Sequence, residues 1–280
     1  MSYSYVTLSH ALASAGIEEA AYEAALLLHR FAGVSRVSLL ADREREFDLP
    51  LLEEAVRRRL EREPLQYILG SWEFFGLTFT VNSHCLVPRA DTECLVEEAI
   101  RRLPREARFA DLCTGSGCIA VATLSSRPDL RGVALELYPD TLALAEKNAA
   151  DNGVSHRFTP LQADLLSGGA EALREFAPLD ALLSNPPYIP THVIEGLSPE
   201  VKREPRAALD GGEDGLVFYR AILRDYAPLV RPGGLIILEI GYDQGDALRL
   251  LAAEQMPRAS VEVLKDLGGQ DRVVCLTLPC

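Results

Sequence analysis

The first part of the chain spaces its apolar residues as helices do. Ala20–Phe31 is rich in Ala and Leu, with a polar residue at every third or fourth position. Leu51–Leu60 repeats this pattern, with apolar side chains on one face and arginines on the other. Pro50 stands where a first-turn proline is tolerated, and Pro64 follows the end of the pattern. The spacing predicts a small unit of about three or four helices over residues 1–63.

After the helical segment the pattern changes to alternation. Between Trp72 and Val81, the apolar residues Phe75, Leu77 and Phe79 alternate with small or polar ones. A period of two residues indicates strands, so we expect a short β-hairpin here. This hairpin would join the helical segment to the rest of the chain.

From about Cys94 onward, predicted strands and helices alternate along the chain. The predicted strands are Arg108–Cys113, Gly132–Leu137, Leu179–Ser184, Leu235–Ile240, Ser260–Leu264 and Arg272–Leu278. The predicted helices are Cys118–Ser125, Pro139–Asn152, Leu216–Val230 and Gln244–Glu254, and a turn is predicted at Arg231–Gly234. This order predicts an α/β fold whose mostly parallel sheet is covered by helices. The last two strands are close together in sequence, which predicts an antiparallel pair at one edge.

A glycine-rich loop follows the first strand of this alternating part. The strand runs into Asp111-Leu-Cys-Thr-Gly-Ser-Gly117, where glycines allow a tight turn and close approach of a ligand to the backbone. Glu136 closes the next strand 19 residues after the loop, where an acid can hold ribose hydroxyls. Asp164 lies in Gln162-Ala-Asp-Leu-Leu166, where we expect one more strand to end between Leu137 and Leu179, and it is a candidate acceptor for an adenine amine. Because Gly115–Ala120 also matches the dinucleotide fingerprint G-x-G-x-x-A, the loop by itself leaves the cofactor open.

The tetrapeptide Asn185-Pro-Pro-Tyr188 follows the apolar strand Ala181–Ser184. The carboxyl ends of strands are where open α/β sheets hold ligands. An amide or aryl-amine nitrogen is a poor nucleophile and must be held in line with the group that it attacks. The Asn185 side-chain oxygen can accept one of its N–H groups, the carbonyl of Pro186 can accept the second, and the Tyr188 ring can pack on the planar group. Positioning and electrostatics would then supply the rate without a strong base.

Composition narrows the range of substrates. The chain of 280 residues has a net charge of −13, and nucleic-acid affinity rests largely on Lys and Arg, so a protein or small molecule is favoured over nucleic acid. None of the six cysteines forms Cys-x-x-Cys or stands at zinc-finger spacing from a histidine, which argues against a metal site and is typical of reduced thiols in a cytoplasmic protein. The start MSYSYVTLSH lacks the features of a signal peptide, and apolar stretches such as Leu235–Ile240 are too short to span a bilayer.

Several longer segments carry a resemblance that covers nearly the whole chain. They are Pro64-Leu-Gln-Tyr-Ile-Leu-Gly70, Phe74-Phe-Gly-Leu-Thr-Phe79, Val87-Pro-Arg-Ala-Asp-Thr-Glu93, Asn185-Pro-Pro-Tyr-Ile189, Glu204-Pro-Arg-Ala-Ala-Leu-Asp-Gly-Gly212 and Leu238-Glu-Ile-Gly241. With these segments the sequence resembles the release factor glutamine methyltransferases, also called protein-(glutamine-N5) methyltransferases. General adenine and guanine methyltransferases share only the glycine loop and the Asn-Pro-Pro-Tyr motif.

The resemblance implies a fold and a reaction. It implies a Rossmann-like class I methyltransferase domain over residues 88–280, an N-terminal helical substrate-docking domain over 1–70 and a β-hairpin linker over 71–87. It further implies S-adenosylmethionine as cofactor, with S-adenosylhomocysteine as product. The implied acceptor is the side-chain nitrogen N5 of the glutamine in the Gly-Gly-Gln loop of class I peptide chain release factors.

The resemblance also assigns site residues. The implied cofactor-binding residues are Cys113, Thr114, Gly115, Ser116, Gly117, Glu136, Asp164, Leu165 and Asn185. The implied catalytic residues are Asn185, Pro186 and Tyr188, and the same residues with Pro187 and Arg89 would bind the substrate. Thr92 and Glu93 match a family segment that lines the site.

The chain departs from the family pattern at a few positions. The family usually has glycine where this chain has Cys113, a second proline in place of Ala90, and aspartate in place of Glu136. We expect a slightly altered cavity and the same chemistry from these changes. The chain's own Gly268-Gly-Gln270 lies just before the final strand. We interpret it as a coincidental turn sequence and not as a self-methylation site.

Three other functions fit parts of the sequence. An adenine or guanine amino-methyltransferase would share Asn-Pro-Pro-Tyr, but the charge of −13 weighs against nucleic acid. A nicotinamide-dependent oxidoreductase would use G-x-G-x-x-A and would leave Asn185-Pro-Pro-Tyr188 unexplained. A non-catalytic module that only binds the cofactor would have no need of Asn185 and Tyr188.

Overall fold

The computed structural model describes residues 2–280, and these residues form two compact units. The helical unit contains the chain up to Ser71 together with the short segment Ser198–Arg203. The sheet unit contains Trp72–Leu197 and Glu204–Cys280. The chain therefore leaves the sheet unit after Leu197 and re-enters it at Glu204. In this part of the chain, residues 2–280, no helix is both long and apolar enough to cross a membrane.

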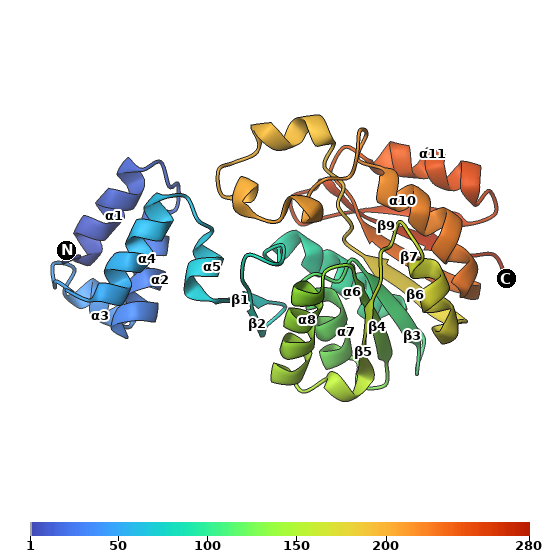
Figure 1. Cartoon of the computed structure of the whole chain (residues 1–280), viewed down its shortest axis with the longest axis horizontal. Coiled ribbons are helices and arrows are strands. Elements are labelled where there is room, and N and C mark those ends of the chain that lie inside the picture. The colour runs from blue at the N-terminus through green and yellow to red at the C-terminus, as the bar shows by residue number, and fades with distance from the viewer. Residues whose placement is uncertain (1) are drawn as a thin grey trace. The chain divides into compact units, whose positions relative to one another are not determined.

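The helical unit is built around leucine-rich helix faces. Its helices are α1 Tyr5–Ser14, α2 Ala20–Ala32, α3 Arg36–Ala41, α4 Pro50–Leu60 and α5 Leu65–Leu69 (Figure 1). The two helices predicted from their spacing, near residues 20 and 51, are confirmed as α2 and α4. The prediction of three or four helices over residues 1–63 agrees with the four helices α1 to α4 in residues 2–63, and α5 follows Pro64.

A buried arginine ties the segment Ser198–Arg203 to the helical unit. Arg59 on α4 is only 4% exposed, and its guanidinium donates to Glu23 at 2.6 Å and to Glu200 at 2.9 Å. Arg62 binds the same Glu200 carboxylate at 2.8 Å. A buried charge is tolerated when it is paired and hydrogen-bonded, and here two carboxylates do this. The spacing of apolar residues in the helices does not predict this pairing, because Glu200 is 141 positions away in sequence.

The predicted β-hairpin is confirmed as β1 Ser71–Phe74 and β2 Leu77–Thr80. Its two-residue turn places Phe75 at φ 52° and Gly76 at φ 71°. Positive φ at both central residues gives a turn whose twist matches paired strands. The N–H of Phe75 donates to the Glu93 carboxylate at 2.7 Å, which holds the turn in place.

The seven-stranded sheet confirms the predicted α/β class. Its strands are β3 Arg108–Leu112, β4 Arg131–Glu136, β5 Phe158–Gln162, β6 Leu179–Ser184, β7 Val230–Glu239, β8 Ser260–Lys265 and β9 Asp271–Thr277. Their order is β5-β4-β3-β6-β7-β9-β8, and the pairs from β5 to β7 are parallel. The last two strands, β8 and β9, pair antiparallel at one edge, as the sequence predicts.

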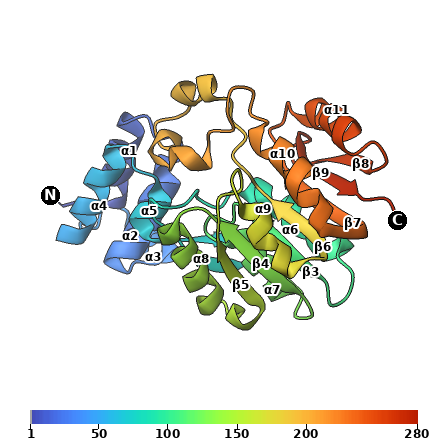
Figure 2. The ribbon, with the colours of Figure 1, turned by 45° about the vertical axis from the view of Figure 1, so that its right-hand side comes forward.

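Helices cover both faces of this sheet (Figures 1 and 2). They are α6 Glu93–Arg102, α7 Cys118–Ser126, α8 Pro139–Asp151, α9 Gly169–Leu173, α10 Val217–Ala221 and α11 Gly245–Gln255. Successive strand residues point to opposite faces, so Leu112 and Leu182 join Tyr219 of α10 and Leu248 of α11 in one buried cluster. The remaining strand positions face α6, α7 and α8, which contact β3, β4, β5, β7 and β9. Both faces of the sheet are therefore buried, and ligands can reach it only at its ends.

Two local predictions between residues 216 and 234 were wrong. The predicted helix Leu216–Val230 is regular only over α10, then widens into a π-helical turn at Ile222–Tyr226 and tightens into a 3-10 turn at Ala227–Leu229. The predicted turn Arg231–Gly234 lies within β7, where the register with β6 jumps from Leu179↔Val230 to Ala181↔Leu235. These four residues stand opposite the single residue Asp180 of β6, with Gly233 at φ 71°, so the Gly- and Pro-rich segment forms a bulge inside the strand and not a turn that ends it.

Candidate functional site

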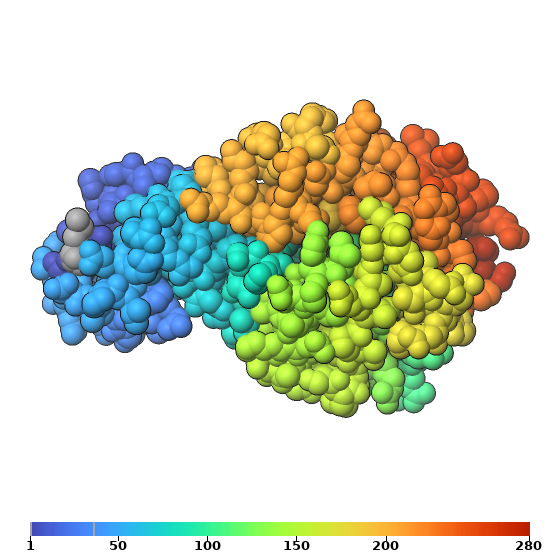
Figure 3. Space-filling model, viewed as in Figure 1, coloured from blue at the N-terminus to red at the C-terminus, as the bar shows by residue number. Residues whose placement is uncertain are grey.

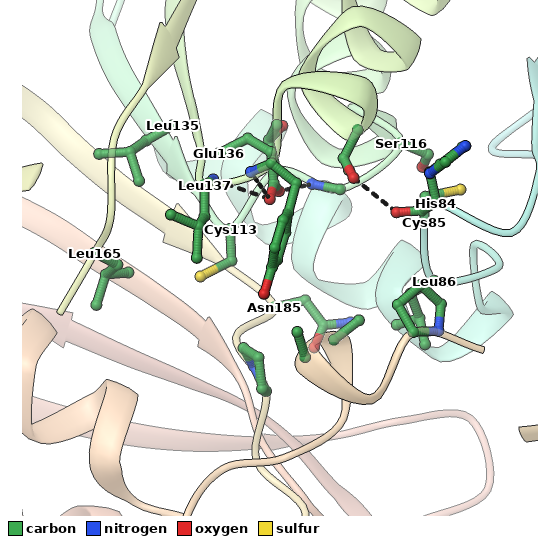
Figure 4. Close-up of a pocket in the computed structure, with 18 of the residues that line it drawn as sticks. His84, Cys85, Leu86, Cys113, Ser116, Leu135, Glu136, Leu137, Leu165 and Asn185 are labelled. Atoms are coloured by element: carbon green, nitrogen blue, oxygen red, sulfur yellow. Dashed lines mark hydrogen bonds between the residues drawn. The ribbon is translucent and has the colours of Figure 1, made fainter. Parts of the chain in front are cut away.

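A cavity of about 300 Å³ lies at the carboxyl ends of β3, β4, β5 and β6 (Figure 4). Its volume is in the range of small-molecule sites, about 300–1,000 Å³. The connection from β3 leads to β4 on one side, whereas β6 lies on the other side of β3, so the strand order reverses here. Such a reversal point is where open α/β sheets bind ligands. The loops that follow these strands carry most of the residues predicted for the site.

The glycine loop after β3 is held by an acid that the sequence analysis did not single out. Asp111 is fully buried, and its Oδ2 accepts from the Thr114 hydroxyl at 2.6 Å and from the Ala120 N–H at 3.2 Å. Burial raises the pKa of Asp111 to about 7, against the effect of these two bonds. Asp111 thus fixes the loop to the start of α7. The signal that could have revealed it is an acid that ends a buried strand immediately before a glycine loop.

The backbone conformation at Cys113 shows why the family usually has glycine at this position. Its φ is 58°, in the left-handed region that favours glycine. A side chain there costs roughly 1–2 kcal/mol relative to ordinary backbone. Cys113 lines the cavity, and burial raises the pKa of its thiol well above the usual range, so it is a neutral wall.

Glu136 lies at the end of β4 with its carboxylate beside the glycine loop. The carboxylate accepts from three backbone N–H groups, those of Gly115 at 3.1 Å, Leu137 at 2.9 Å and Tyr138 at 3.2 Å. Figure 4 shows Glu136 beside Leu137 at the cavity. The residue is 8% exposed, and burial raises its pKa although these bonds lower it. These hydrogen bonds hold the Glu136 carboxylate between the glycine loop and the end of β4. A ligand that lies over both segments can therefore donate a hydrogen bond to it.

Most other predicted cofactor residues also line the cavity. They are Thr114, Gly115, Ser116, Asp164 and Leu165. Gly117 does not line it. A Cβ at Gly117 would lie 3.1 Å from Cβ of Ala145, so this glycine allows α7 and α8 to pack closely. In the structure Gly117 thus has a packing role, and its contact with the cofactor stays a prediction.

The Asn-Pro-Pro-Tyr motif enters the cavity through only two of its members. Asn185 and Pro187 line it, whereas Pro186 is buried outside the lining. Tyr188 also lies outside the lining, against the cluster around α10, and its hydroxyl is 3.4 Å from Glu239 Oε1. The backbone oxygen of Tyr188 accepts from Gln244 at 3.1 Å. The Tyr188 ring thus supports the loop in this structure and does not form a wall of the cavity.

The segment Val87–Glu93 divides into residues that line the cavity and one that does not. Arg89 and Thr92 line it. Arg89 is paired with the Glu204 carboxylate, which is 5% exposed and also accepts from the Val87 N–H at 2.8 Å. Glu93 instead caps the hairpin turn, as described above. Arg89 is therefore held on the rim by a carboxylate from the segment that follows the Asn-Pro-Pro-Tyr loop.

Comparison with known proteins matches both parts of the chain. Residues 6–70 match the family model described as the PrmC N-terminal domain, and residues 89–212 match the methyltransferase small domain. The release factor glutamine methyltransferase of Geobacter sulfurreducens is 42% identical over 94% of this chain and 91% of its own length. That of Moorella thermoacetica is 43% identical over 93% of this chain and 92% of its own length.

The chain belongs to the release factor glutamine methyltransferase family. A solved structure from Alicyclobacillus acidocaldarius, described as a release-factor-specific protein-(glutamine-N5) methyltransferase, is 34% identical over 72% of this chain and 100% of that one, with a TM-score of 0.44. Membership in this family makes the chain an S-adenosylmethionine-dependent protein-glutamine N-methyltransferase. It sets aside both the nicotinamide-dependent oxidoreductase and the non-catalytic module.

The cavity fits the cofactor of this family. S-adenosylmethionine presents ribose hydroxyls, a flat adenine and a charged amino acid end, and a site for it needs an acceptor, apolar walls and exposed backbone. Glu136 supplies a buried acceptor, Leu135 and Leu165 supply apolar walls, and Gly115, at φ 57°, keeps the loop backbone open. Glu136 ends β4 and the glycine loop follows the neighbouring strand β3, so both can contact one bound cofactor molecule.

Behind Asn185 lies a group of hydrogen-bonded side chains that the sequence pattern did not indicate. Asn185 Nδ2 donates to the Thr92 hydroxyl at 3.2 Å, and that hydroxyl donates to Glu239 Oε2 at 2.6 Å. Glu239 is 1% exposed and lies at the end of β7, in the segment Leu238–Gly241 that carried part of the family resemblance. An acid within a buried apolar strand is the signal that could have drawn attention to it.

Proposed function

We propose that this enzyme transfers the methyl group of S-adenosylmethionine to the side-chain amide nitrogen of the glutamine in the Gly-Gly-Gln loop of class I release factors. The observation that carries the proposal is the orientation of Asn185. Its Nδ2 is bound to Thr92, and its Oδ1 makes no hydrogen bond within residues 2–280, so the oxygen is free to accept from a substrate amide. Relatives named release factor glutamine methyltransferase support the choice of substrate.

The proposed cofactor-binding residues come from three strand ends and the Asn-Pro-Pro-Tyr loop. Glu136 would accept from the ribose hydroxyls, and Asp164 from the adenine amine, with Leu165 beside the base. The glycine loop would offer backbone N–H groups at Thr114, Gly115 and Ser116, and Asn185 would border the methyl group. Burial, which raises the pKa of Glu136, also places its carboxylate in a region of low dielectric, where its hydrogen bonds are strong.

The proposed chemistry depends on positioning. When bound, S-adenosylmethionine supplies a methyl group that is activated by its positive sulfonium. Asn185 Oδ1 accepts one N–H of the substrate amide, and the Pro186 carbonyl accepts the other, which aims the nitrogen lone pair. Both acceptors stabilise the positive charge that develops on this nitrogen as the new N–C bond forms. A protonated amide nitrogen is strongly acidic, so its proton leaves to water without a dedicated base.

We further propose that the helical unit docks the release factor. It is a compact unit of its own, and its match to a family-specific N-terminal model supports a role particular to this family. It exposes large apolar side chains, with Val37 77% exposed, Leu40 64% and Tyr22 49%. Val37 and Leu40 share the short helix α3, and neighbouring exposed apolar groups are typical of protein contact sites.

The net charge and the free thiols support the proposed class of substrate and the proposed location. A net charge of −13 supports a protein substrate in preference to nucleic acid. The six cysteines are all free, which supports a reducing, cytoplasmic location for the reaction.

A labelling experiment tests the proposed substrate. Purified enzyme and tritium-labelled cofactor would be incubated with a release factor, with the same factor carrying alanine in place of the Gly-Gly-Gln glutamine, and with methyl-free DNA. We expect label on the unaltered release factor alone. Label on the DNA with none on the release factor would overturn the proposed substrate and favour the adenine or guanine amino-methyltransferase.

A further inference from the structure

Three side chains from distant parts of the chain meet behind the substrate side of the cavity. Asn185 follows β6 and Glu239 ends β7, and these strands pair in parallel with Ser184 opposite Leu238. The two side chains are therefore neighbours at the carboxyl edge of the sheet. Thr92, in the 3-10 turn Ala90–Thr92 before α6, bridges them, 3.2 Å from Asn185 Nδ2 and 2.6 Å from Glu239 Oε2.

The chemistry of the three groups gives this chain of hydrogen bonds a direction. A carboxylate can only accept, so the single hydroxyl proton of Thr92 must point to Glu239. The Thr92 oxygen then has only lone pairs for Asn185, and only the NH₂ end of that amide can donate to them. The oxygen end of Asn185 is consequently turned the other way. Without such a partner, the two ends of an asparagine amide have nearly the same shape and either could face the substrate.

We propose that Glu239 and Thr92 are positioning residues that fix which end of the Asn185 amide faces the substrate. The proposal rests on the proposed function of Asn185 as acceptor for the glutamine amide. Glu239 does not line the cavity, whereas Thr92 does, so Glu239 acts through Thr92. The same carboxylate reaches Tyr188 through its other oxygen, 3.4 Å from the tyrosine hydroxyl. One buried acid thus holds both ends of the Asn-Pro-Pro-Tyr motif.

The surroundings of Glu239 make its charge sensitive to pH. Burial raises its pKa to about 7, the bonds from Thr92 and Tyr188 and the positive charge of Arg272 lower it, and Asp91 raises it. Arg272 is shared, since it also pairs with Asp91 at 3.3 Å and Asp266 at 3.1 Å. Several titratable or charged groups face Glu239. They are Asp91 in the turn before α6, Cys94 on α6, Cys118 on α7, Tyr188 in the motif, Tyr219 on α10 and Arg272 on β9.

Protonation of Glu239 reverses the direction of the hydrogen bonds. A neutral carboxyl can donate to the Thr92 oxygen, and the Thr92 proton is then free to point at the Asn185 amide. In that arrangement the oxygen end of the Asn185 amide turns toward Thr92 and its NH₂ end turns toward the substrate. The Asn185 NH₂ would then face the N–H groups of the substrate amide, and neither group can accept. Because the carboxylate is lost as the pH falls through its pKa, turnover should decline on the acid side, with a midpoint near pH 7.

Matched variants test the proposal. Thr92→Val keeps the branched shape without the hydroxyl, Thr92→Ser restores the hydroxyl, and Glu239→Gln keeps the shape without a group that titrates. Thr123→Val is the control, because Thr123 on α7 is also fully buried but its hydroxyl has no partner within residues 2–280. Initial rates of release factor methylation would be measured from about pH 6 to about pH 9, with kcat and both KM values at each pH.

The expected outcome separates positioning from a structural role. Thr92→Val should lower kcat by about tenfold or more, as expected for a displaced polar contact, with KM for the cofactor changed less than about threefold. Thr92→Ser should recover most of kcat, Glu239→Gln should lose the acid-side decline, and Thr123→Val should match the unaltered enzyme. Wild-type kcat in Thr92→Val, or an unchanged acid limb in Glu239→Gln, would overturn the proposal.

A second measurement needs no catalysis. The side-chain ¹⁵N–H₂ signals of Asn185, assigned with Asn185→Ala, would be followed against pH in the free enzyme. We expect them to titrate with a midpoint near 7, and to lose this titration in Glu239→Gln and Thr92→Val. If the amide titrates but the release factor is not methylated, the proposed substrate fails and the positioning role stands. If methylation proceeds and the amide signals stay flat, the positioning role fails.

Discussion

Gly211 offers a way to displace the Asn-Pro-Pro-Tyr motif without altering any of its residues. A Cβ built on Gly211 would lie 2.7 Å from Cα and 2.8 Å from the carbonyl carbon of Tyr188. Carbon atoms in contact are normally about 3.5–4.0 Å apart, so Gly211→Ala must push the two backbones apart by roughly 0.8 Å. Both contacts are backbone atoms, which cannot rotate away as the end of a flexible side chain can.

The shift at Tyr188 would be transmitted to the rest of the motif because the loop is tied on both sides. The Ile189 N–H donates to the Leu209 carbonyl at 3.0 Å, and the Gly211 N–H donates to the Ile189 carbonyl at 2.9 Å. A misplacement of about 1 Å at a reacting centre can cost about 10²-fold in rate. We therefore expect Gly211→Ala to lower kcat by roughly 10- to 100-fold. Cofactor affinity should stay within about threefold, because the glycine loop and Glu136 belong to other strand ends.

The assay would combine methyl transfer to a release factor, calorimetry with the cofactor, and a thermal melt to show that the variant is folded. Gly196→Ala is the matched control. It lies on the same connection between β6 and α10, its φ is not in the left-handed region, and a Cβ there meets nothing within 4 Å. In the space-filling view this gold segment of the chain lies on the surface (Figure 3). Folded Gly211→Ala with turnover within about twofold of wild type would refute the steric reasoning, as would an equal loss in Gly196→Ala.

Further changes test other parts of the molecule. Asn185→Ala should reduce kcat by about 10²-fold or more while cofactor affinity falls less, and single-turnover rates with calorimetry would contradict this if both fell equally. Glu136→Ala should weaken cofactor binding by about 1–3 kcal/mol, measured by calorimetry, and unchanged affinity would remove Glu136 from the site. Arg59→Met removes the guanidinium that pairs with Glu23 and one of the two that pair with Glu200, and should cost about 3 kcal/mol, so an unshifted urea midpoint of the helical unit would contradict its role. The pair Val37→Asp and Leu40→Asp should raise KM for the release factor and leave KM for the cofactor unchanged, and an unaltered KM for the release factor would exclude this face from docking.

The local parts of the site could be read from the sequence. The order of strands and helices follows from apolar periods of 2.0 and 3.6 residues, which depend only on neighbouring positions. The glycine loop, Glu136 and Asn185 each stand at the end of a predicted strand, and parallel strands bring their carboxyl ends to one edge. The cavity residues on β3, β4, β5 and β6 therefore followed from the pattern together with the family motifs.

Only the tertiary structure decided which distant groups meet. Thr92 contacts Glu239, 147 positions away, because β7 pairs with β6 and α6 packs against β7. Glu200 joins the helical unit because a buried Arg59 requires a second carboxylate. Arg231–Gly234 forms a bulge within β7, and Gly117 serves helix packing, because neighbouring elements restrict them more strongly than local preference does. Hydrogen-bond partners and close contacts depend on the order of strands in space, and apolar periodicity along the chain carries no information on that order.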